Sequence, residues 1–305
     1  MSFLYLLEDL RCPFLDTVMQ IITYCGEELV FMALAIICYW CVSKAEGYYI
    51  LFVGFLGTVI NQCLKLFFRI PRPWVRDPNF KAVESALDGA TGYSFPSGHT
   101  QSVTGTFGAI AIWNKKLWLR IACVAIIVLT AFSRMYLGVH TPADVGVSLG
   151  VALVLLFVLY PLVRKAAEEP RVMYILLGIM TAVSLAYVIY ANWGSFPVDM
   201  NSENLEHGRK NSYTILGCML GFLVGYTIEH RFIRFDVRAP WWGQLIKIVG
   251  GLAGLLIIKE GLKPLFSLIG YTHLSANAVR YGLMVIFATC VWPQLFRVWR
   301  KKADG

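Results

Sequence analysis

Charged residues are scarce in this sequence. They make up 15% of its 305 residues, whereas hydrophobic residues reach 57% and the mean hydropathy is +0.61. Soluble proteins carry about 25% charged and about 45 to 50% apolar residues, and disordered chains are poorer still in apolar residues. The composition excludes a disordered chain, nearly excludes a soluble enzyme, and predicts that the apolar excess faces lipid.

No disulfide framework is indicated either. The eight cysteines are scattered, and at least six lie in apolar runs, where a thiol behaves as a small hydrophobic group. Cys38 and Cys41 form a C-x-x-C pair inside an apolar segment without the strand and helix of a redox site, so we interpret them as structural. The first 28 residues lack a basic start followed by an apolar core, so no cleavable signal peptide is expected.

Long apolar runs recur along the chain, and nine of them approach the 20 or so residues that a helix needs to span a bilayer. The sequence therefore predicts an all-α fold, a polytopic transmembrane helical bundle of about nine spans. The third span is rich in hydroxyl side chains, which favours a helix enclosed by its neighbours. The predicted spans are 26–43, 48–68, 98–113, 117–135, 143–163, 172–191, 212–228, 245–266 and 279–297.

The spans divide into two predicted domains, a catalytic core over 1–170 and additional transmembrane helices over 171–305. A polar segment of about 30 residues follows the second span, and a second insert covers 192–211. Segments of this length are often functional. Gly217, Gly221 and Gly225 form overlapping G-x-x-x-G patterns, which suit close helix contact within the bundle or across a homodimer. The contact within the bundle is the favoured alternative.

The formal net charge of +8 is more typical of cytoplasmic loops than of a nucleic-acid footprint, so no nucleic-acid partner is expected. Counted over alternate loops, Lys and Arg number 14 on one side and 9 on the other. The richer side is predicted to be cytoplasmic. The loops 69–98, 134–142 and 192–211 then face outward from a bacterial plasma membrane, or into the lumen of an organelle as the alternative.

Three polar clusters lie at the ends of different spans, all on the predicted outer face: Lys65-x6-Arg72-Pro73, Pro96-Ser97-Gly98-His99 and Ser133-Arg134-x5-His140-x3-Asp144. Each has a purely structural interpretation. Lys65 can extend to the membrane interface, Ser97 can cap the third span, and Asp144 fits the third position of a helix whose first turn contains proline. These interpretations do not explain why two histidines and three cations lie together on the predicted outer face, namely His99, His140, Lys65, Arg72 and Arg134.

Taken together, the clusters indicate an anion site with a nucleophile and a proton donor. Lys65, Arg72 and Arg134 can bind phosphate oxygens, the arginines through two N–H groups each. The amides of Ser97 and Gly98 at a helix N-terminus add further donors. Asp144, four residues after His140, can orient one imidazole nitrogen and leave the other free to attack, and His99 remains as the acid for the departing oxygen.

The three blocks resemble the complete tripartite signature of the type 2 phosphatidic acid phosphatase (PAP2) superfamily, in its integral-membrane lipid phosphate phosphatase branch. The resemblance implies metal-independent hydrolysis of a phosphate or diphosphate through a phosphohistidine. It implies His140 as nucleophile, Asp144 as its partner and His99 as general acid, with no metal and no cofactor. It also implies that the phosphoryl group is bound by Lys65, Arg72, Ser97, Gly98 and Arg134.

The expected substrate is a lipid phosphate, and the other expected partners are the membrane lipids that surround the helices. Three alternatives remain open: a phosphatase of a soluble sugar phosphate, a transporter or flippase that binds lipid phosphate without cleaving it, and a phosphotransferase that uses an alcohol in place of water. Extra helices beyond the family's simpler six-helix members weaken the assignment of a substrate. Lys259, Glu260 and Lys263 form a charged cluster there, interpreted either as functional or as an ion pair between Glu260 and Lys263.

Overall fold

The computed structural model describes residues 1–197, 200–268, 270–271 and 273–297, which form helices and turns without a strand. Four charged residues considered in the sequence analysis lie outside the described residues. They are Asp199 in the insert 192–211, and Arg300, Lys301 and Lys302, which belong to the 14 basic residues of the predicted cytoplasmic side. The α-helices are α1 Ser2–Asp9, α2 Pro13–Thr23, α3 Glu28–Cys41, α4 Lys44–Phe68, α5 Pro73–Arg76, α6 Gly98–Trp113, α7 Leu117–Tyr136, α8 Pro142–Glu168, α9 Pro170–Trp193, α10 Ser202–Ile228, α11 Trp241–Leu268 and α12 Ala276–Ile286. The 3-10 turns are η1 Tyr24–Gly26, η2 Glu84–Ala86 and η5 Trp292–Phe296, and the π-helical turns are η3 Glu229–Ile233 and η4 Phe287–Val291.

The predicted all-α membrane fold is confirmed, but the count of nine spans is not. Six helices of the described chain are long and apolar enough to cross a membrane, or seven if the pair Pro13–Gly26 and Glu28–Cys41, bent by 48°, forms one broken span. Two of the predicted spans are short, because α3 has 14 residues and α6 has 16, whereas about 20 are needed. The segment predicted at 245–266 forms α11, which is not among the six.

The chain folds into two compact units. Unit 1 comprises Met1–Ala35, Tyr49–Pro161 and Met200–Leu205, and unit 2 comprises Ile36–Tyr48, Leu162–Asp199 and Glu206–Gly305. All eight residues of the predicted site belong to unit 1. The two predicted domains are continuous in sequence and meet at residue 170. The two units are discontinuous, because their boundaries fall inside α3, α4, α8 and α10.

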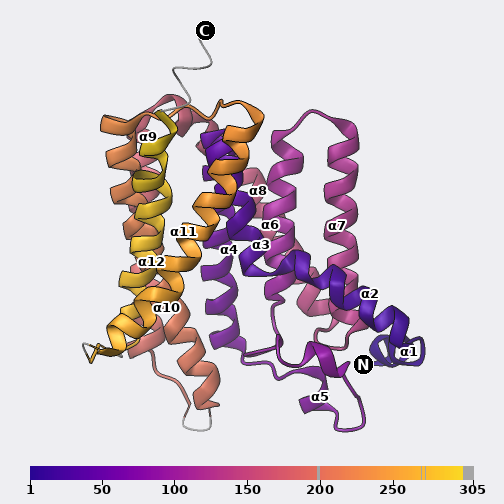
Figure 1. Ribbon diagram of the computed structural model, residues 1–305. Coiled ribbons are helices and arrows are strands. Elements are labelled where there is room, and N and C mark those ends of the chain that lie inside the picture. The colour runs from indigo at the N-terminus through magenta and orange to yellow at the C-terminus, as the bar shows by residue number, and fades with distance from the viewer. Residues whose placement is uncertain (198–199, 269, 272, 298–305) are drawn as a thin grey trace. The chain divides into compact units, whose positions relative to one another are not determined.

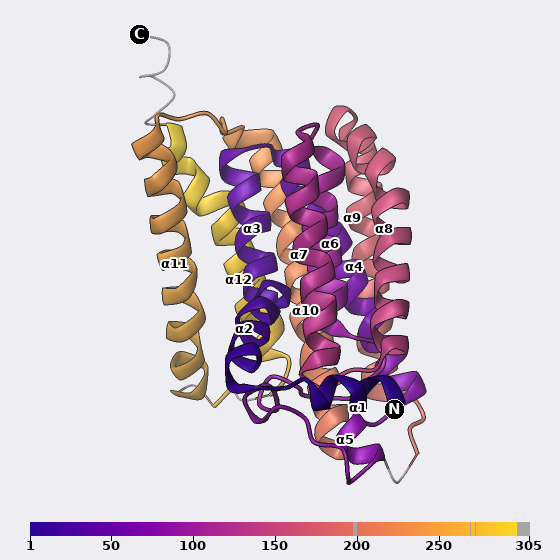
Figure 2. The same ribbon diagram turned by 90° about the vertical axis from the view of Figure 1, so that its right-hand side faces the viewer.

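Unit 1 contains two N-terminal helices that sequence analysis did not predict as elements. Figures 1 and 2 show α1 and α5 at the lower ends of α6 and α7. The Tyr5 hydroxyl donates to Asp77 Oδ2 at 2.9 Å, and Arg11 Nε donates to the carbonyl of Tyr136 at 3.0 Å. Helices α1 and α2 therefore attach to the loop after α5 and to the end of α7, at the end of the unit where the polar clusters lie.

In unit 2, the glycine stripe of α10 packs within the chain. A Cβ atom on Gly221 would lie 2.6 Å from the carbonyl oxygen of Gly282, and one on Gly217 would collide with the backbone of Ala278. Gly225 meets the side chain of Thr289 in the same way. This packing favours the intramolecular alternative, and a homodimer through the three glycines stays a prediction.

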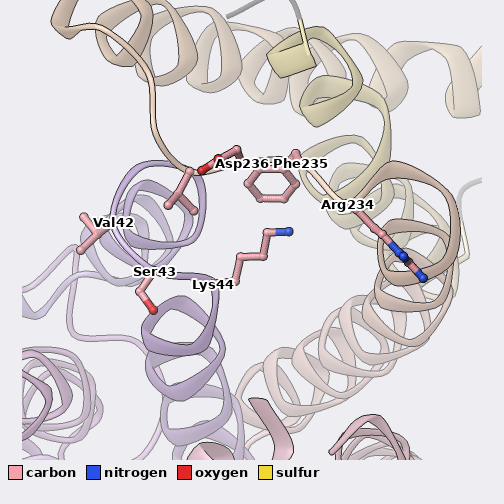
Figure 3. A pocket seen from close by; sticks show the side chains of 7 residues that line it. Val42, Ser43, Lys44, Arg234, Phe235 and Asp236 are labelled. Carbon is pink, nitrogen blue, oxygen red and sulfur yellow. The ribbon is translucent and has the colours of Figure 1, made fainter. Parts of the chain in front are cut away.

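Unit 2 also buries charges that sequence analysis did not single out. Lys44 forms an ion pair with Glu229 at 2.5 Å and lies 4.0 Å from the centroid of the Phe235 ring, beside a hollow of about 370 Å³ (Figure 3). Lys247 is fully buried and donates to the carbonyl of Val237 at 2.9 Å. A buried charge is costly unless it is paired or hydrogen-bonded, and these contacts satisfy the buried Glu229 and Lys247.

Two expectations for the C-terminal part are corrected. The insert 192–211 is not a loop throughout, because α10 begins at Ser202, where the Asn201 side chain accepts a hydrogen bond from the amide of Asn204 at 2.9 Å. Polar residues continue this helix beyond its apolar part. The ion pair between Glu260 and Lys263 was one of two alternatives for the charged cluster. Among the described residues Glu260 pairs instead with Lys259 at 3.8 Å, with the Glu260 side chain 71% exposed.

Candidate active site

The three polar clusters meet at one end of unit 1. Lys65 stands near the C-terminus of α4, Ser97 caps the start of α6, Arg134 lies in the last turn of α7, and Asp144 lies in the first turn of α8. The exposed fraction of each residue is small: Lys65 8%, Arg72 6%, Ser97 0%, Arg134 2%, His140 1% and Asp144 2%. The structure therefore brings together in the interior the groups that the sequence placed on one face.

Arg72 is held by the backbone around it. Its Nε donates to the carbonyl of Gly92 at 3.1 Å, Nη2 to Thr91 at 2.7 Å, and Nη1 to Val139 at 2.9 Å. The same Nη1 lies 3.0 Å from Nε2 of His140. A guanidinium has five N–H groups, and these contacts occupy most of them. Arg72 thus ties the loop before α6 to the loop that carries His140.

Arg134 is placed differently. Its Nη1 donates to the hydroxyl of Thr23 at 2.7 Å, whereas its buried Nε and Nη2 have no hydrogen-bond partner among the described residues. Buried N–H groups of this kind are rare in folded proteins, and leaving a cation without an acceptor is costly. An anion with at least two oxygens would satisfy both groups, as the sequence predicted for a phosphate.

Lys65 and the start of α6 complete the anion-binding part. Lys65 Nζ donates to the carbonyl of Tyr93 at 2.9 Å. The hydroxyl of Ser97 accepts from the amide of Thr100 at 3.4 Å, which is the capping contact expected from its structural interpretation. A Cβ atom on Gly98 would meet no atom within 4 Å. Gly98 therefore faces open space at a helix N-terminus, where an anion is favoured.

His140 and Asp144 face each other with Asp144 also capping its own helix. His140 Nδ1 lies 3.5 Å from Asp144 Oδ2, and this carboxylate oxygen accepts from the Thr141 amide at 2.7 Å and from the Ser94 hydroxyl at 2.6 Å. The capping interpretation of Asp144 therefore holds, whereas its role as the partner of His140 stays a prediction, because Nδ1 has no hydrogen-bond partner among the described residues. His140 lies in the loop between α7 and α8, where burial, reinforced by the charges of Arg72 and Arg134, lowers its pKa well below the usual range. The imidazole is thus neutral at pH 7.

His99, in the first turn of α6, lies at the edge of the cluster. Its side chain is 15% exposed, and its Nε2 is 3.0 Å from Oε1 of Glu27. Glu27 is the residue between η1 and α3. Its contact with His99 was not foreseen in the sequence.

The side chains do not form a metal-binding group. Among the described residues there is no cluster of three or more His, Cys, Asp or Glu side chains that could hold a metal ion. Magnesium and calcium need several oxygen ligands, and the carboxylate of Asp144 is engaged by Ser94 and Thr141. The charge balance of the site favours an anion as its ligand.

Comparison with known proteins identifies the family. Residues 46–168 match the PAP2 superfamily, and residues 213–303 match the transmembrane extension of PAP2 superfamily phosphatases. The chain belongs to the PAP2 superfamily. This confirms the resemblance read from the three blocks, and the matched transmembrane extension, with the apolar helices, makes the chain a multi-pass membrane protein.

Curated relatives match part of the chain, and two of them are bacterial. Undecaprenyl-diphosphatase BcrC of Bacillus subtilis (strain 168) is 31% identical over 150 residues, which cover 48% of this chain and 74% of the relative. Phosphatidylglycerophosphatase B of the same organism is 31% identical over 160 residues, covering 47% of this chain and 74% of the relative. No solved structure matches the chain.

Three residues that contact the site were missed by sequence analysis. Thr23 and Glu27 come from the N-terminal segment, and Ser94 precedes the second block. Their partners lie 111, 72 and 50 residues away in the sequence. Local patterns carry no signal over such distances. Ser94 alone stands near a recognised block, three residues before Ser97.

Proposed function

We propose that this PAP2 protein is an integral-membrane phosphatase that hydrolyses a lipid phosphate or diphosphate, without a metal, through a phosphohistidine. The observation that carries the proposal is Arg134, which is 2% exposed and whose buried Nε and Nη2 have no hydrogen-bond partner among the described residues. A phosphoryl group there would accept from Arg134, with Lys65 and the amide of Gly98 as further donors.

The reaction follows from the positions of the two histidines. Asp144 faces Nδ1 of His140, which leaves Nε2 as the attacking atom, next to Arg72. Nε2 forms a bond to phosphorus while the bond from phosphorus to the lipid oxygen breaks, and His99 gives its proton to that oxygen. Water then attacks phosphorus and passes a proton to His99, the bond between nitrogen and phosphorus breaks, and inorganic phosphate is released.

A lipid is the favoured substrate class. One of these relatives is named for undecaprenyl diphosphate and the other for phosphatidylglycerophosphate. Both compounds carry their phosphate groups on molecules with long apolar chains. A site at the end of a bundle of apolar helices suits such a tail. The excess of Lys and Arg in the alternate loops supports an outward-facing site, and the bacterial relatives support a plasma membrane. The catalytic core over 1–170 stays part of this proposal.

The test is phosphate release in detergent from a panel of lipid phosphates: phosphatidic acid, phosphatidylglycerol phosphate, a polyprenyl diphosphate and a sphingoid phosphate. We expect release from at least one, and we expect His140→Ala to lower it by several orders of magnitude. His140→Ala should still bind inorganic phosphate, because the cations remain. Near wild-type hydrolysis by this variant would refute the phosphohistidine. A short-chain analogue hydrolysed as fast as the lipid would favour a soluble substrate.

A further inference from the structure

A carboxylate outside the three sequence blocks contacts the proposed acid. Oε1 of Glu27 lies 3.0 Å from Nε2 of His99, and the Glu27 side chain is 41% exposed. Glu27 stands ahead of the residues that match the PAP2 superfamily, 46–168. The contact joins the N-terminal segment to the first turn of α6, within unit 1.

The turn that carries Glu27 is fixed against the site at two further points. A Cβ atom on Gly26 would lie 2.9 Å from Cβ of His99 and from its carbonyl oxygen, so only glycine allows the turn to lie so close. Thr23, just before the turn, accepts the hydrogen bond from Arg134. The position of Glu27 is therefore set by the packing of η1 on the site and not by the side chain alone.

We propose that Glu27 is a positioning residue for the acid step, stabilising the protonated form of His99 and orienting it toward the leaving oxygen. The inference rests on the proposed function, since it needs His99 to act as the acid. A carboxylate that accepts from Nε2 stabilises the imidazolium and directs its other nitrogen, Nδ1, away from Glu27. His99 gives its proton from Nδ1 as the bond from phosphorus to the lipid oxygen breaks, while Glu27 stays ionised throughout.

The surroundings of His99 explain why a carboxylate is needed there. The charged and titratable groups acting on it are Arg134 of α7, Lys65 of α4 and His140, besides Glu27. Burial disfavours the protonated imidazole most, and the positive charges of Arg134 and Lys65 disfavour it further. Glu27 is the anion that opposes them at this ring. Without it, His99 would carry its proton over a narrower range of pH.

The first test compares leaving groups. An alkyl phosphate needs a proton on its departing oxygen, whereas p-nitrophenyl phosphate leaves as a stable phenolate and needs little help. We expect Glu27→Gln to lower kcat on an alkyl lipid phosphate about 10- to 100-fold, with KM changed much less, and to lower kcat on p-nitrophenyl phosphate by less than about threefold. An equal loss on both substrates would show a merely structural role and overturn the proposal.

The second test is the pH dependence of kcat. His99 must be protonated to act, so activity falls as pH rises past the point where it loses its proton. Removing the carboxylate moves that falling limb to lower pH in Glu27→Gln. Glu27→Asp should partly restore the wild-type profile. The matched control is Glu28→Gln, which removes the same charge from the next, exposed position and should leave kcat and its profile unchanged. An unshifted limb in Glu27→Gln would contradict the proposal.

A third measurement separates this inference from the proposed function, because it needs no substrate. Thermal unfolding of Glu27→Gln, His99→Gln and the double variant forms a cycle that reports whether the two side chains interact. We expect the double variant to lose less than the sum of the single losses in Tm. Additive losses would overturn the contact itself. If the wild-type protein released no phosphate while the cycle showed coupling, the proposed function would be wrong. The contact between Glu27 and His99 would still be confirmed.

Discussion

At the scale of the residue, Arg72 and Arg134 carry the same charge but have different hydrogen-bond partners. Three carbonyls and His140 engage Arg72, whereas Arg134 keeps Nε and Nη2 without partners among the described residues. The sequence predicted one phosphate-binding role for both. The contacts of Arg72 add a second role, because they order the loop before α6 and the loop that carries His140. Spacing could not reveal this, since three of the acceptors are backbone oxygens.

Ser94 offers a prediction at the same scale. Its hydroxyl donates to Asp144 Oδ2 at 2.6 Å, and it is 1% exposed. A hydrogen bond to a charged group contributes about 1.5 to 3 kcal/mol, so we expect Ser94→Ala to lower kcat about tenfold or more. Ser184→Ala is the control, because Ser184 is equally buried and bonds the carbonyl of Met180 in its own helix. Equal activity in both variants would exclude a role for Ser94.

The residue types in the site also predict the response to chelators. Three cations surround the proposed phosphate position, and no metal-binding cluster occurs among the described residues. Positive side chains can neutralise a phosphoryl group in place of a metal. Phosphate release should therefore persist in excess EDTA at an unchanged rate. Loss of activity in EDTA, followed by recovery on adding a divalent ion, would contradict this mechanism.

At the scale of the element, apolar periodicity located helices well where lipid and packing define them. The segment predicted at 98–113 is α6, Gly98–Trp113, and that predicted at 117–135 is α7, Leu117–Tyr136. Apolar periodicity did not predict α1 and α2, which are too short to span a bilayer, or the polar first turns of α10. The segment of α1 and α2 is attached by tertiary contacts, such as Arg11 with the carbonyl of Tyr136, and the start of α10 is capped by Asn201. Such contacts leave no trace in a hydropathy pattern.

The glycine stripe of α10 gives a prediction at this scale. The Cβ atom of Gly221→Ala would lie 2.6 Å from the carbonyl oxygen of Gly282, so α10 and α12 would have to move apart. Overpacking of this kind costs about 1 to 3 kcal/mol, and Tm in detergent should fall. Gly261→Ala in α11 is the control, because its Cβ would meet no atom within 4 Å. A Gly221→Ala protein as stable as the control would refute the close contact.

At the scale of the whole molecule, the loop charges predict which side of the membrane the site faces. After removal of the native cysteines, a cysteine placed at residue 85 should react with a membrane-impermeant thiol reagent in intact cells. One placed at residue 167 should not, because it lies on the side with 14 basic residues against 9. Permeabilised cells provide the control, in which both positions should react. The reverse pattern in intact cells would put the active site in the cytoplasm.

In the proposed mechanism, burial of the site affects how the product departs. Lys65, Arg72 and Arg134 are at most 8% exposed, so the headgroup must shed water to reach them. Inorganic phosphate has lost the tail that held the substrate at the membrane, yet it keeps its attraction to the same three cations. Its escape requires rehydration of both the anion and the emptied pocket. Inorganic phosphate is thus expected to compete with the lipid substrate for these three cations.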